Sequence, residues 1–369
     1  MSKLTHTVAE VLYRFNVHAQ VEVDLLAAAF DEILQSQHTP SKDALLSALL
    51  TGVMTKGPTV DEVVALLRCA FRLDAFVPEQ RERVQIADGR PVIAVAGSGK
   101  KGVKTINIST PSAFVAASQG VVVAKAGSSS TSSVTGSADF IRAVGAKIDM
   151  EPKQMALLLE SVGIAFFAIE RLLPRFDRTY GGRFYAPHVL SFGLAALAIP
   201  IAPDGLLYGL AHPDVELALK VLREFGTDHA MVISSTHDGI HFLDEVGVYG
   251  ATRLVGMKEG AIGRLLTFRP TDLVEFPRYT ARDIAHARTK RLNVVCSAKA
   301  LAGRGQPAHE DFICLNAGNI LYLAGNVGNI RQGYSVAKEA IRSGAAIKKL
   351  YAFVEATSGE TAKLDAILD

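Results

Sequence analysis

The sequence has no apolar run long enough to cross a lipid bilayer. Its longest candidate covers residues 193–202 and contains Pro200, whereas a helical span needs about 20 apolar residues. The N-terminus also lacks a basic region followed by an apolar block, which is the pattern of a secretory signal. We therefore expect a cytoplasmic protein with no membrane partner.

Cysteine is scarce. Cys69, Cys296 and Cys314 are scattered, and none of them belongs to a CxxC pair. An odd number of isolated thiols fits a reducing compartment and gives no sign of a disulfide framework. We interpret them as core residues, because free cysteine packs as a small apolar side chain.

Net charge is also small. The 39 Lys and Arg residues nearly balance the 37 Asp and Glu residues, which gives a formal charge of +2 at pH 7. There is thus no global electrostatic case for binding nucleic acid. With 49% apolar and 21% charged residues in 369 positions, the chain is globular and long enough for one large or two medium domains.

Two regions differ in pattern. Residues 1–75 read as helices, and Thr59 and Glu62 form a capping-box pattern before apolar residues at helical spacing. Residues 76–90 look like a polar linker. We predict an N-terminal helical domain over 1–75 and an α/β domain over 76–369.

The central stretch of the α/β domain covers residues 92–149. Apolar runs at 92–96 and 121–124 predict two buried strands. A glycine loop and a small-residue helix over 112–119 follow the first strand, and a glycine-serine loop follows the second. Both loops lie where a strand gives way to a helix, which is where open α/β sheets bind ligands.

The chemistry of these loops favours an anion. Glycines let backbone N–H groups approach a ligand, and a helix N-terminus adds donors and a positive dipole end. Hydroxyl and ammonium groups add to them: Ser109, Thr110, Ser132, Ser133, Ser137, Lys100, Lys101, Lys104 and Lys125. We predict a phosphate or diphosphate site. The alternative is that these residues only form tight turns.

The first loop is not a Walker A motif. Its spacing is Gly-x-Gly-x-x-Gly, which alone suggests a dinucleotide fold. However, no acidic residue ends the second strand to bind a ribose, and Lys125 stands there instead.

Elsewhere the pattern predicts helices over 155–169 and 215–225, and strands over 230–234 and 292–296. His188 is either a site residue or a packed loop histidine. The basic segment 278–291 is either a solvated helix face or a patch for an anionic partner.

Four linked motifs of the central stretch resemble the anthranilate phosphoribosyltransferase-like family, whose fold is that of the nucleoside phosphorylases and phosphoribosyltransferases. They are Gly97-Ser98-Gly99-Lys100-Lys101-Gly102, Asn107-Ile108-Ser109-Thr110, Lys125-Ala126-Gly127-Ser128 and Ser132-Ser133-Val134-Thr135-Gly136-Ser137-Ala138-Asp139. The order and spacing of these motifs are similar to those of the family. The resemblance covers nearly the whole chain and is thin over 180–205 and 274–310.

The resemblance implies transfer of phosphoribose from 5-phosphoribosyl 1-diphosphate (PRPP), with Mg²⁺, to an aromatic or other planar acceptor. It implies that the donor is held by Gly97, Gly99, Lys100, Lys101, Asn107, Ser109, Thr110, Lys125 and Ser137. The implied magnesium ligands are Ser109, Asp244 and Glu245. Carboxylate oxygens are the hard ligands that Mg²⁺ prefers.

The resemblance also implies that Arg183, nine residues after Pro174, holds a carboxylate of the acceptor. The alternative is that Arg183 is a surface residue of a glycine turn. A homodimer through the helical domain is implied too, and part of 155–190 is expected to join that domain.

The chain departs from the family at several motif positions. Lys100 and Lys101 replace a Gly-Asp pair in the donor loop, and Ala126 and Ser128 replace a histidine and an asparagine on the acceptor side. These departures predict an acceptor other than anthranilate. The two lysines either supply charge to the diphosphate and lessen the need for one magnesium ion, or fill the donor's space.

Two other functions stay open at this point. A nucleoside phosphorylase would share the fold, but its Lys-x-Ser-Thr-Gly-Gly loop is absent. A non-catalytic homologue could bind nucleic acid or another anion through the two loop lysines and the basic segment 278–291.

Overall fold

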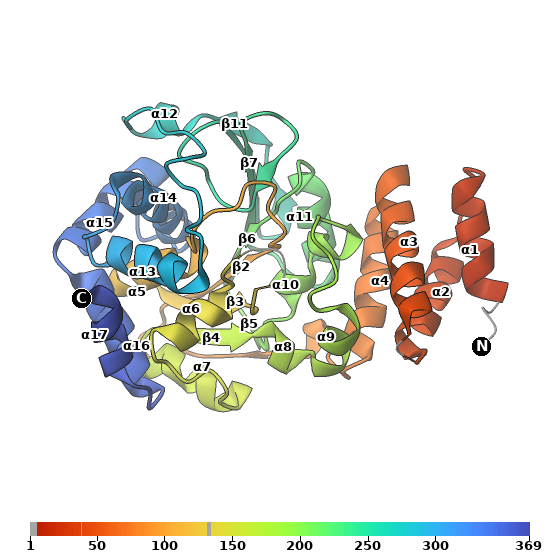
Figure 1. The fold of residues 1–369 in the computed structure, drawn as a ribbon, viewed down its shortest axis with the longest axis horizontal. Helices are drawn as coiled ribbons and strands as arrows, with labels where there is room; N and C mark the ends of the chain where they lie inside the picture. Colours follow the sequence, from red (N-terminus) through yellow and green to blue (C-terminus); the bar gives the residue numbers. More distant parts are fainter. Residues whose placement is uncertain (1–5, 38, 131–133) are drawn as a thin grey trace.

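The computed structural model describes residues 6–37, 39–130 and 134–369. A large α/β domain carries a smaller group of helices at the N-terminus (Figure 1). The predicted class, α/β with a smaller all-helical domain, is confirmed. Ser132 and Ser133, two of the predicted anion-binding hydroxyls, lie outside the described residues.

The N-terminal helices pack through apolar side chains and end at recognisable caps. They are α1 (His6–Asn16), α2 (Val23–Gln35), α3 (Pro40–Lys56) and α4 (Val60–Arg72). The capping box is confirmed, since Thr59 Oγ1 accepts from the Glu62 N–H at 3.3 Å and Glu62 Oε2 accepts from the Thr59 N–H at 2.9 Å. Phe30 and Leu67 are among the buried side chains of this group.

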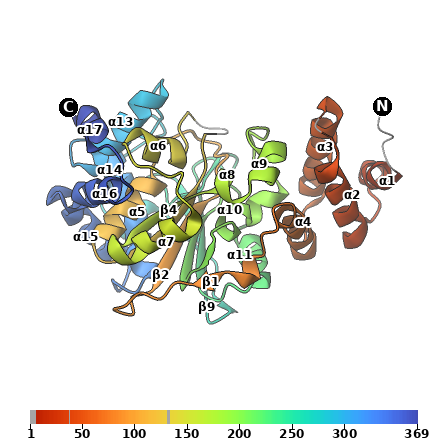
Figure 2. The same cartoon turned by 90° about the horizontal axis from the view of Figure 1, so that it is seen from below.

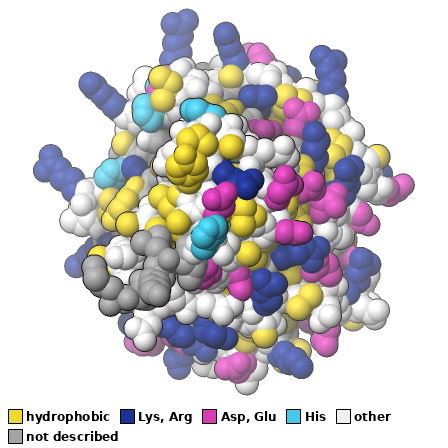
Figure 3. All heavy atoms as spheres, turned by 90° about the vertical axis from the view of Figure 1, so that its right-hand side faces the viewer, with side chains coloured by type: hydrophobic (Ala, Val, Ile, Leu, Met, Phe, Trp, Pro, Cys, Tyr) yellow, Lys and Arg dark blue, Asp and Glu magenta, His cyan; other side chains and the backbone are white. Residues whose placement is uncertain are grey.

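Figure 3 looks at the end of the molecule that these helices form. Apolar, acidic and basic side chains are interspersed there, without one dominant patch. Tyr13 and Val17, in and just after α1, are exposed. The homodimer through this domain stays a prediction.

The core of the larger domain is a nine-stranded sheet in the order β10-β9-β7-β6-β2-β3-β4, with β8 paired to β7 and β11 to β9. Its five parallel strands are β2 (Val92–Gly97), β3 (Val122–Gly127), β4 (Ile164–Ala168), β6 (Gly205–Gly209) and β7 (Ala230–Thr236). Antiparallel strands complete it: β8 (Phe242–Leu243), β9 (Ala251–Lys258), β10 (Ala261–Ile262) and β11 (Leu266–Phe268).

The central strands are apolar and buried because helices cover both faces of the sheet. One face carries α5 (Ser109–Ser118), α13 (Lys290–Leu301), α14 (Pro307–Leu323), α15 (Ile330–Arg342), α16 (Ala345–Ala356) and α17 (Thr361–Leu368), as Figure 2 shows. The other carries α10 (Leu194–Leu197) and α11 (Val215–Glu224), next to α4.

Short elements fill the remaining connections. They are η1 (Pro78–Gln80), α6 (Ser137–Ala143), α7 (Pro152–Ser161), α8 (Ile169–Leu172), α9 (Pro174–Tyr180), η2 (Val189–Phe192), α12 (Pro270–Leu273) and the parallel pair of β1 (Glu82–Arg83) with β5 (Ile201–Ala202). Within the described residues, no helix combines the length and the apolar content that crossing a membrane requires.

Two sequence-based predictions about elements are wrong. Residues 292–296 belong to helix α13, whereas a strand was predicted, and the helix predicted over 155–169 ends at Ser161 and gives way to strand β4. Both errors concern short apolar runs, which fit a buried helix and a buried strand equally well. Of the basic segment 278–291, residues 278–289 form turns and loops, and residues 290–291 begin helix α13, so most of the segment is not a helix face.

The connection through α9 contacts the helical domain. Asp74, just after α4, accepts from the N–H groups of Arg175 and Phe176 at 2.7 and 2.8 Å, and Lys42 Nζ donates to Thr179 Oγ1 at 3.4 Å. These contacts fix one wall of the pocket described below. The assignment of part of 155–190 to the helical domain stays a prediction.

Candidate active site

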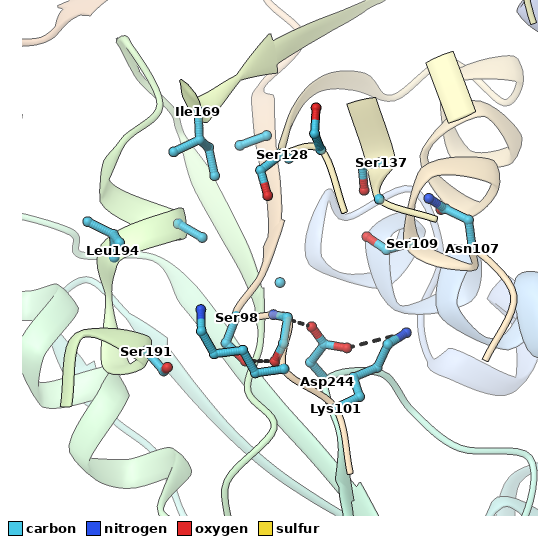
Figure 4. A pocket seen from close by; sticks show the side chains of 18 of the residues that line it. Ser98, Lys101, Asn107, Ser109, Ser128, Ser137, Ile169, Ser191, Leu194 and Asp244 are labelled. Carbon is cyan, nitrogen blue, oxygen red and sulfur yellow. Dashed lines mark hydrogen bonds and ion pairs between the residues drawn. The ribbon is translucent and has the colours of Figure 1, made fainter. Parts of the chain in front are cut away.

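A pocket lies at the carboxyl ends of β2, β3 and β6. In Figure 4, Ile169 and Leu194 lie on one side of it and Asn107 and Ser109 on the other, with Lys101 close to Asp244. Ten of the predicted site residues line this pocket: Gly97, Gly99, Lys100, Lys101, Asn107, Ser109, Lys125, Ser137, Asp244 and Glu245.

The first glycine loop, residues 97–102, is held tightly against the segment that carries Asp244. The Gly99 N–H donates to Asp244 Oδ2 at 2.8 Å, and the Gly102 N–H donates to the Phe242 carbonyl at 2.9 Å. A Cβ at Gly97 would lie 2.6 Å from Asp244 Oδ2, and a Cβ at Gly102 would lie 2.8 Å from the His241 Cα. Glycine is therefore required at both positions for this close approach.

Asp244 and Glu245 form a buried carboxylate pair with Lys101. Lys101 Nζ lies 2.8 Å from Glu245 Oε1 and 3.7 Å from Asp244 Oδ1. Burial and the neighbouring Asp244 raise the pKa of Glu245 to about 8. Burial alone would lower the pKa of Lys101. The attraction of Glu245 and Asp244 exceeds this effect of burial, so the pKa of Lys101 is raised. The ammonium group is thus held in its charged form between the two acids.

Lys125 belongs to the buried part of β3 and lines the same pocket. Its side chain is 2% exposed, and its ammonium group donates to the Ala126 carbonyl. Burial lowers the pKa of Lys125 to about 8, while the negative charges of Asp244 and Glu245 oppose that shift. A bound anion would restore the charge that burial disfavours.

The N-terminus of α5 forms the next part of the pocket wall. Asn107 Oδ1 accepts from the Thr110 N–H at 3.3 Å, and the Ser297 hydroxyl donates to the Asn107 carbonyl at 2.9 Å. Asn107 and Ser109 line the pocket, whereas Thr110 is buried behind it and does not. The Thr110 hydroxyl has no hydrogen-bond partner among the described residues.

The opposite wall is aromatic and apolar. Phe176, Tyr180 and Phe184 form a stack with ring centroids 4.8 and 5.3 Å apart. Lys100 Nζ donates to Tyr180 Oη at 2.9 Å, and Tyr180 Oη lies 2.6 Å from Nε2 of His188. His188 is buried and does not line the pocket, which supports its interpretation as a packed loop histidine. Burial and the nearby Lys100 lower the pKa of His188.

Comparison with known proteins agrees with this geometry. The family model of the glycosyl transferase family, a/b domain, matches residues 89–347. The anthranilate phosphoribosyltransferase of Leptothrix cholodnii is 31% identical over 356 residues, which cover 94% of this chain and 96% of that protein. The enzyme of the same name from Moorella thermoacetica is 34% identical over 331 residues, 89% of this chain and 92% of that protein.

The chain belongs to this glycosyl transferase family. The predicted resemblance to the anthranilate phosphoribosyltransferase-like family is confirmed, and the protein is a transferase.

The fold of the family is confirmed as well. The anthranilate phosphoribosyltransferase of Thermus thermophilus superposes with a TM-score of 0.73 at 22% identity, over 94% of this chain and 99% of that chain. The enzyme from Saccharomyces cerevisiae, solved in complex with PRPP and Mg, gives a TM-score of 0.73 at 19% identity, over 95% and 98% of the two chains.

Arg183 lies apart from the ten predicted site residues that line the pocket. Its Nε donates to Asp43 Oδ1 of α3 at 3.0 Å, and its Nη1 donates to the Gly181 carbonyl at 3.0 Å. It does not line the pocket, although Gly181 does. These contacts fit the alternative role of a turn residue better, and the acceptor-binding role stays a prediction.

Sequence reasoning missed the aromatic and apolar wall of the pocket. Phe176, Asp177 and Tyr180 line it, together with Leu190, Ser191 and Tyr208. One signal was available: Phe176, Tyr180 and Phe184 recur every four residues, which places aromatic side chains on one face of a helix. The contact of Tyr180 with Lys100, 80 positions away, has no such signal.

Proposed function

We propose that the protein transfers the phosphoribosyl group of PRPP to a nitrogen atom of a planar acceptor. The observation that carries this proposal is the meeting of two glycine loops, from adjacent parallel strands, with the Asp244–Glu245 pair in one pocket. Relatives named anthranilate phosphoribosyltransferase match this chain over almost its full length, which supports the same chemistry.

The donor would lie along the polar side of the pocket. The ammonium groups of Lys101 and Lys125 would contact its phosphates. The backbone N–H groups of Lys100 and Lys101 would add to them, since those of Ser98, Gly99 and Gly102 bond within the protein. Asn107, Ser109 and Ser137 would contact it from the α5 and α6 side. Helix N-termini and glycine-rich loops both favour phosphate oxygens, so these contacts share one physical basis.

A magnesium ion fits this site in part. Asp244 Oδ1 and Glu245 Oε2 are buried and lack hydrogen-bond partners among the described residues, so two hard oxygen ligands face the pocket. Ser109 would add a hydroxyl. No cluster of three or more His, Cys, Asp or Glu side chains suited to a metal occurs in the described parts of the chain. The remaining ligands would therefore be oxygens of PRPP and water, and bound Mg²⁺ would neutralise diphosphate charge.

The reaction needs positioning rather than a covalent intermediate on the protein. The acceptor nitrogen forms a bond to the anomeric carbon of ribose, while the bond from that carbon to the diphosphate oxygen breaks. The diphosphate leaves with both electrons of that bond, and the nitrogen then loses a proton. Alignment of the two reactants and charge stabilisation of the leaving group supply the catalysis.

The acceptor would lie between the donor and the aromatic wall. Ile169, Leu173 and Phe176 supply flat apolar surface, and Lys100 supplies a positive charge. We propose an acceptor other than anthranilate, because Ala126 and Ser128 replace the family's acceptor-side histidine and asparagine, and because Arg183 pairs with Asp43.

The test has two stages. Calorimetric titration with PRPP, with and without Mg²⁺, measures donor binding. Diphosphate release is then measured with anthranilate and with a panel of planar amines and azoles. We expect donor binding and turnover with a member of the panel other than anthranilate. Rescue of a tryptophan auxotroph by this gene would overturn the acceptor proposal, and failure to bind PRPP in any condition would overturn the transferase proposal.

A further inference from the structure

Lys101 has a more specific environment than a general phosphate-binding lysine. Its side chain is 13% exposed, and it reaches inward to the acid pair instead of outward to solvent. Its ammonium group donates to Glu245 Oε1 at 2.8 Å and to Thr105 Oγ1 at 2.9 Å. An ammonium group has three N–H donors, so these two bonds leave one N–H for Asp244 Oδ1, which lies 3.7 Å from Nζ, or for a ligand in the pocket.

The position of this ammonium group is set by the backbone on both sides of it. The Gly99 N–H bonds to Asp244 Oδ2, and the Gly102 N–H bonds to the Phe242 carbonyl. The loop therefore follows the acid-bearing segment closely before and after Lys101. A flexible surface lysine would lose rotamer entropy on being fixed there, whereas this backbone already directs the side chain toward the pair.

The charges of Asp244, Glu245 and Lys101 make the ammonium group of Lys101 comparable with a bound cation. Asp244 and Glu245 are 8% and 3% exposed, and Lys101 lies within ion-pair distance of both. The buried Lys125 also interacts with their charges, at longer range. Two buried acids close together repel each other unless a positive charge lies between them. Asp244 Oδ1 and Glu245 Oε2 still lack hydrogen-bond partners among the described residues, so the cluster keeps room for further positive charge.

We propose that Lys101 is a built-in cation of the diphosphate subsite, which takes over at the Asp244–Glu245 pair part of the role of a divalent metal ion. The protein then binds diphosphate with a weakened metal requirement, and a metal ion that approaches the pair competes with the ammonium group. This inference rests on the proposed function, since it concerns the site where the leaving group of PRPP would be held.

The first experiment measures metal dependence with inorganic diphosphate as the probe. The wild-type protein and Lys101→Gln are titrated by calorimetry in a chelator and again in saturating Mg²⁺. We expect the chelator to weaken wild-type binding less than tenfold. In Lys101→Gln, binding in chelator falls by roughly 10- to 100-fold, the usual effect of losing a charge-assisted hydrogen bond, and Mg²⁺ restores most of it.

The second experiment uses a metal alone. Mn²⁺ binding, followed by electron paramagnetic resonance, tightens in Lys101→Gln relative to the wild type because the competing ammonium group is gone. Lys220→Gln is the matched control, since it also removes a lysine charge, and Lys220 is exposed on α11 and does not line the pocket. Thermal melting of all three proteins checks that they fold.

The outcomes separate the two proposals. An equal metal requirement in the wild type and Lys101→Gln, or Mn²⁺ affinity that Lys101→Gln leaves unchanged, would overturn the role of Lys101 alone. A lack of diphosphate binding by the wild type in every condition would overturn the transferase function and this inference with it.

Discussion

Lys100 and Lys101 are adjacent in the sequence, but their side chains make contacts at opposite ends of one pocket. Lys101 lies between Asp244 and Glu245, whereas Lys100 bonds to the hydroxyl of Tyr180, and its ammonium group lies 5.0 Å from the centre of that ring. Lys100 has a φ of +58°, in the left-handed region that few residues other than glycine adopt. This turn of the backbone lets neighbouring lysines point in different directions.

The two ends hold their positive charge in different ways. At the proposed donor end, the charge of Lys101 is paired with buried acids, and backbone hydrogen bonds hold the loop that carries it. At the proposed acceptor end, the ammonium group of Lys100 contacts the ring of Tyr180, which belongs to an aromatic stack. Tyr180 in turn contacts the buried, neutral His188. The donor end is thus suited to a highly charged ligand, and the acceptor end is suited to a flat ligand. Substitutions at each end should therefore affect different substrates.

The largest effect is expected from Asp244→Asn at the donor end. The change keeps the volume of the side chain but removes the negative charge of Asp244, which is paired with Lys101. We expect PRPP affinity to fall about 100-fold, the upper range for losing a charge-assisted contact, as measured by calorimetry with Mg²⁺.

Glu259→Gln is the matched control for this change. It also neutralises an acid, but at an exposed turn between β9 and β10. If Asp244→Asn binds PRPP with an affinity within twofold of that of the wild type, the acid pair is not part of the donor site.

At the acceptor end, Lys100→Met should have a smaller and different effect. Methionine keeps an unbranched apolar side chain but loses the charge and the bond to Tyr180. We expect the KM for the acceptor to rise about tenfold, which corresponds to one hydrogen bond, while PRPP affinity changes less than twofold. Steady-state kinetics with both substrates varied would show this. A matching loss of PRPP affinity would contradict the division of the pocket into two ends.

Much of the donor end could be predicted from the sequence because its parts are local. The strand runs, the glycines and Asn107, Ser109 and Lys125 follow one another within about 30 positions, and each has a local pattern. The contact of Lys101 with Glu245 spans 144 positions, and no local pattern encodes it. The acceptor end depends on how α9 packs on the sheet, so counting from Pro174 selected Arg183 and missed Tyr180.

The neutral histidine at the acceptor end predicts a modest pH effect on stability. The folded-state pKa of His188 lies well below its usual value, because of burial and Lys100. The unfolded chain therefore binds more protons below about pH 6.5, and stability falls as the pH falls. We expect the wild type to lose about 1 kcal/mol more than His188→Gln between pH 7 and pH 5.5, measured by urea unfolding. Parallel pH profiles in the two proteins would show that His188 is not held neutral.

The smallest effect is expected from Arg183→Ala, which tests where the acceptor end stops. Arg183 is 26% exposed and Asp43 is 39% exposed, and such pairs stabilise by at most about 1 kcal/mol. Since Arg183 does not line the pocket, we expect kcat and the acceptor KM to change less than twofold, with a small decrease in thermal stability. Asp43→Ala should lower stability to a similar extent, because both changes break one ion pair. A tenfold rise in acceptor KM in Arg183→Ala but not in Asp43→Ala would show that the guanidinium group turns into the pocket when the acceptor binds. Arg183 would then share the acceptor with Lys100, and a carboxylate-bearing acceptor, anthranilate included, would be favoured.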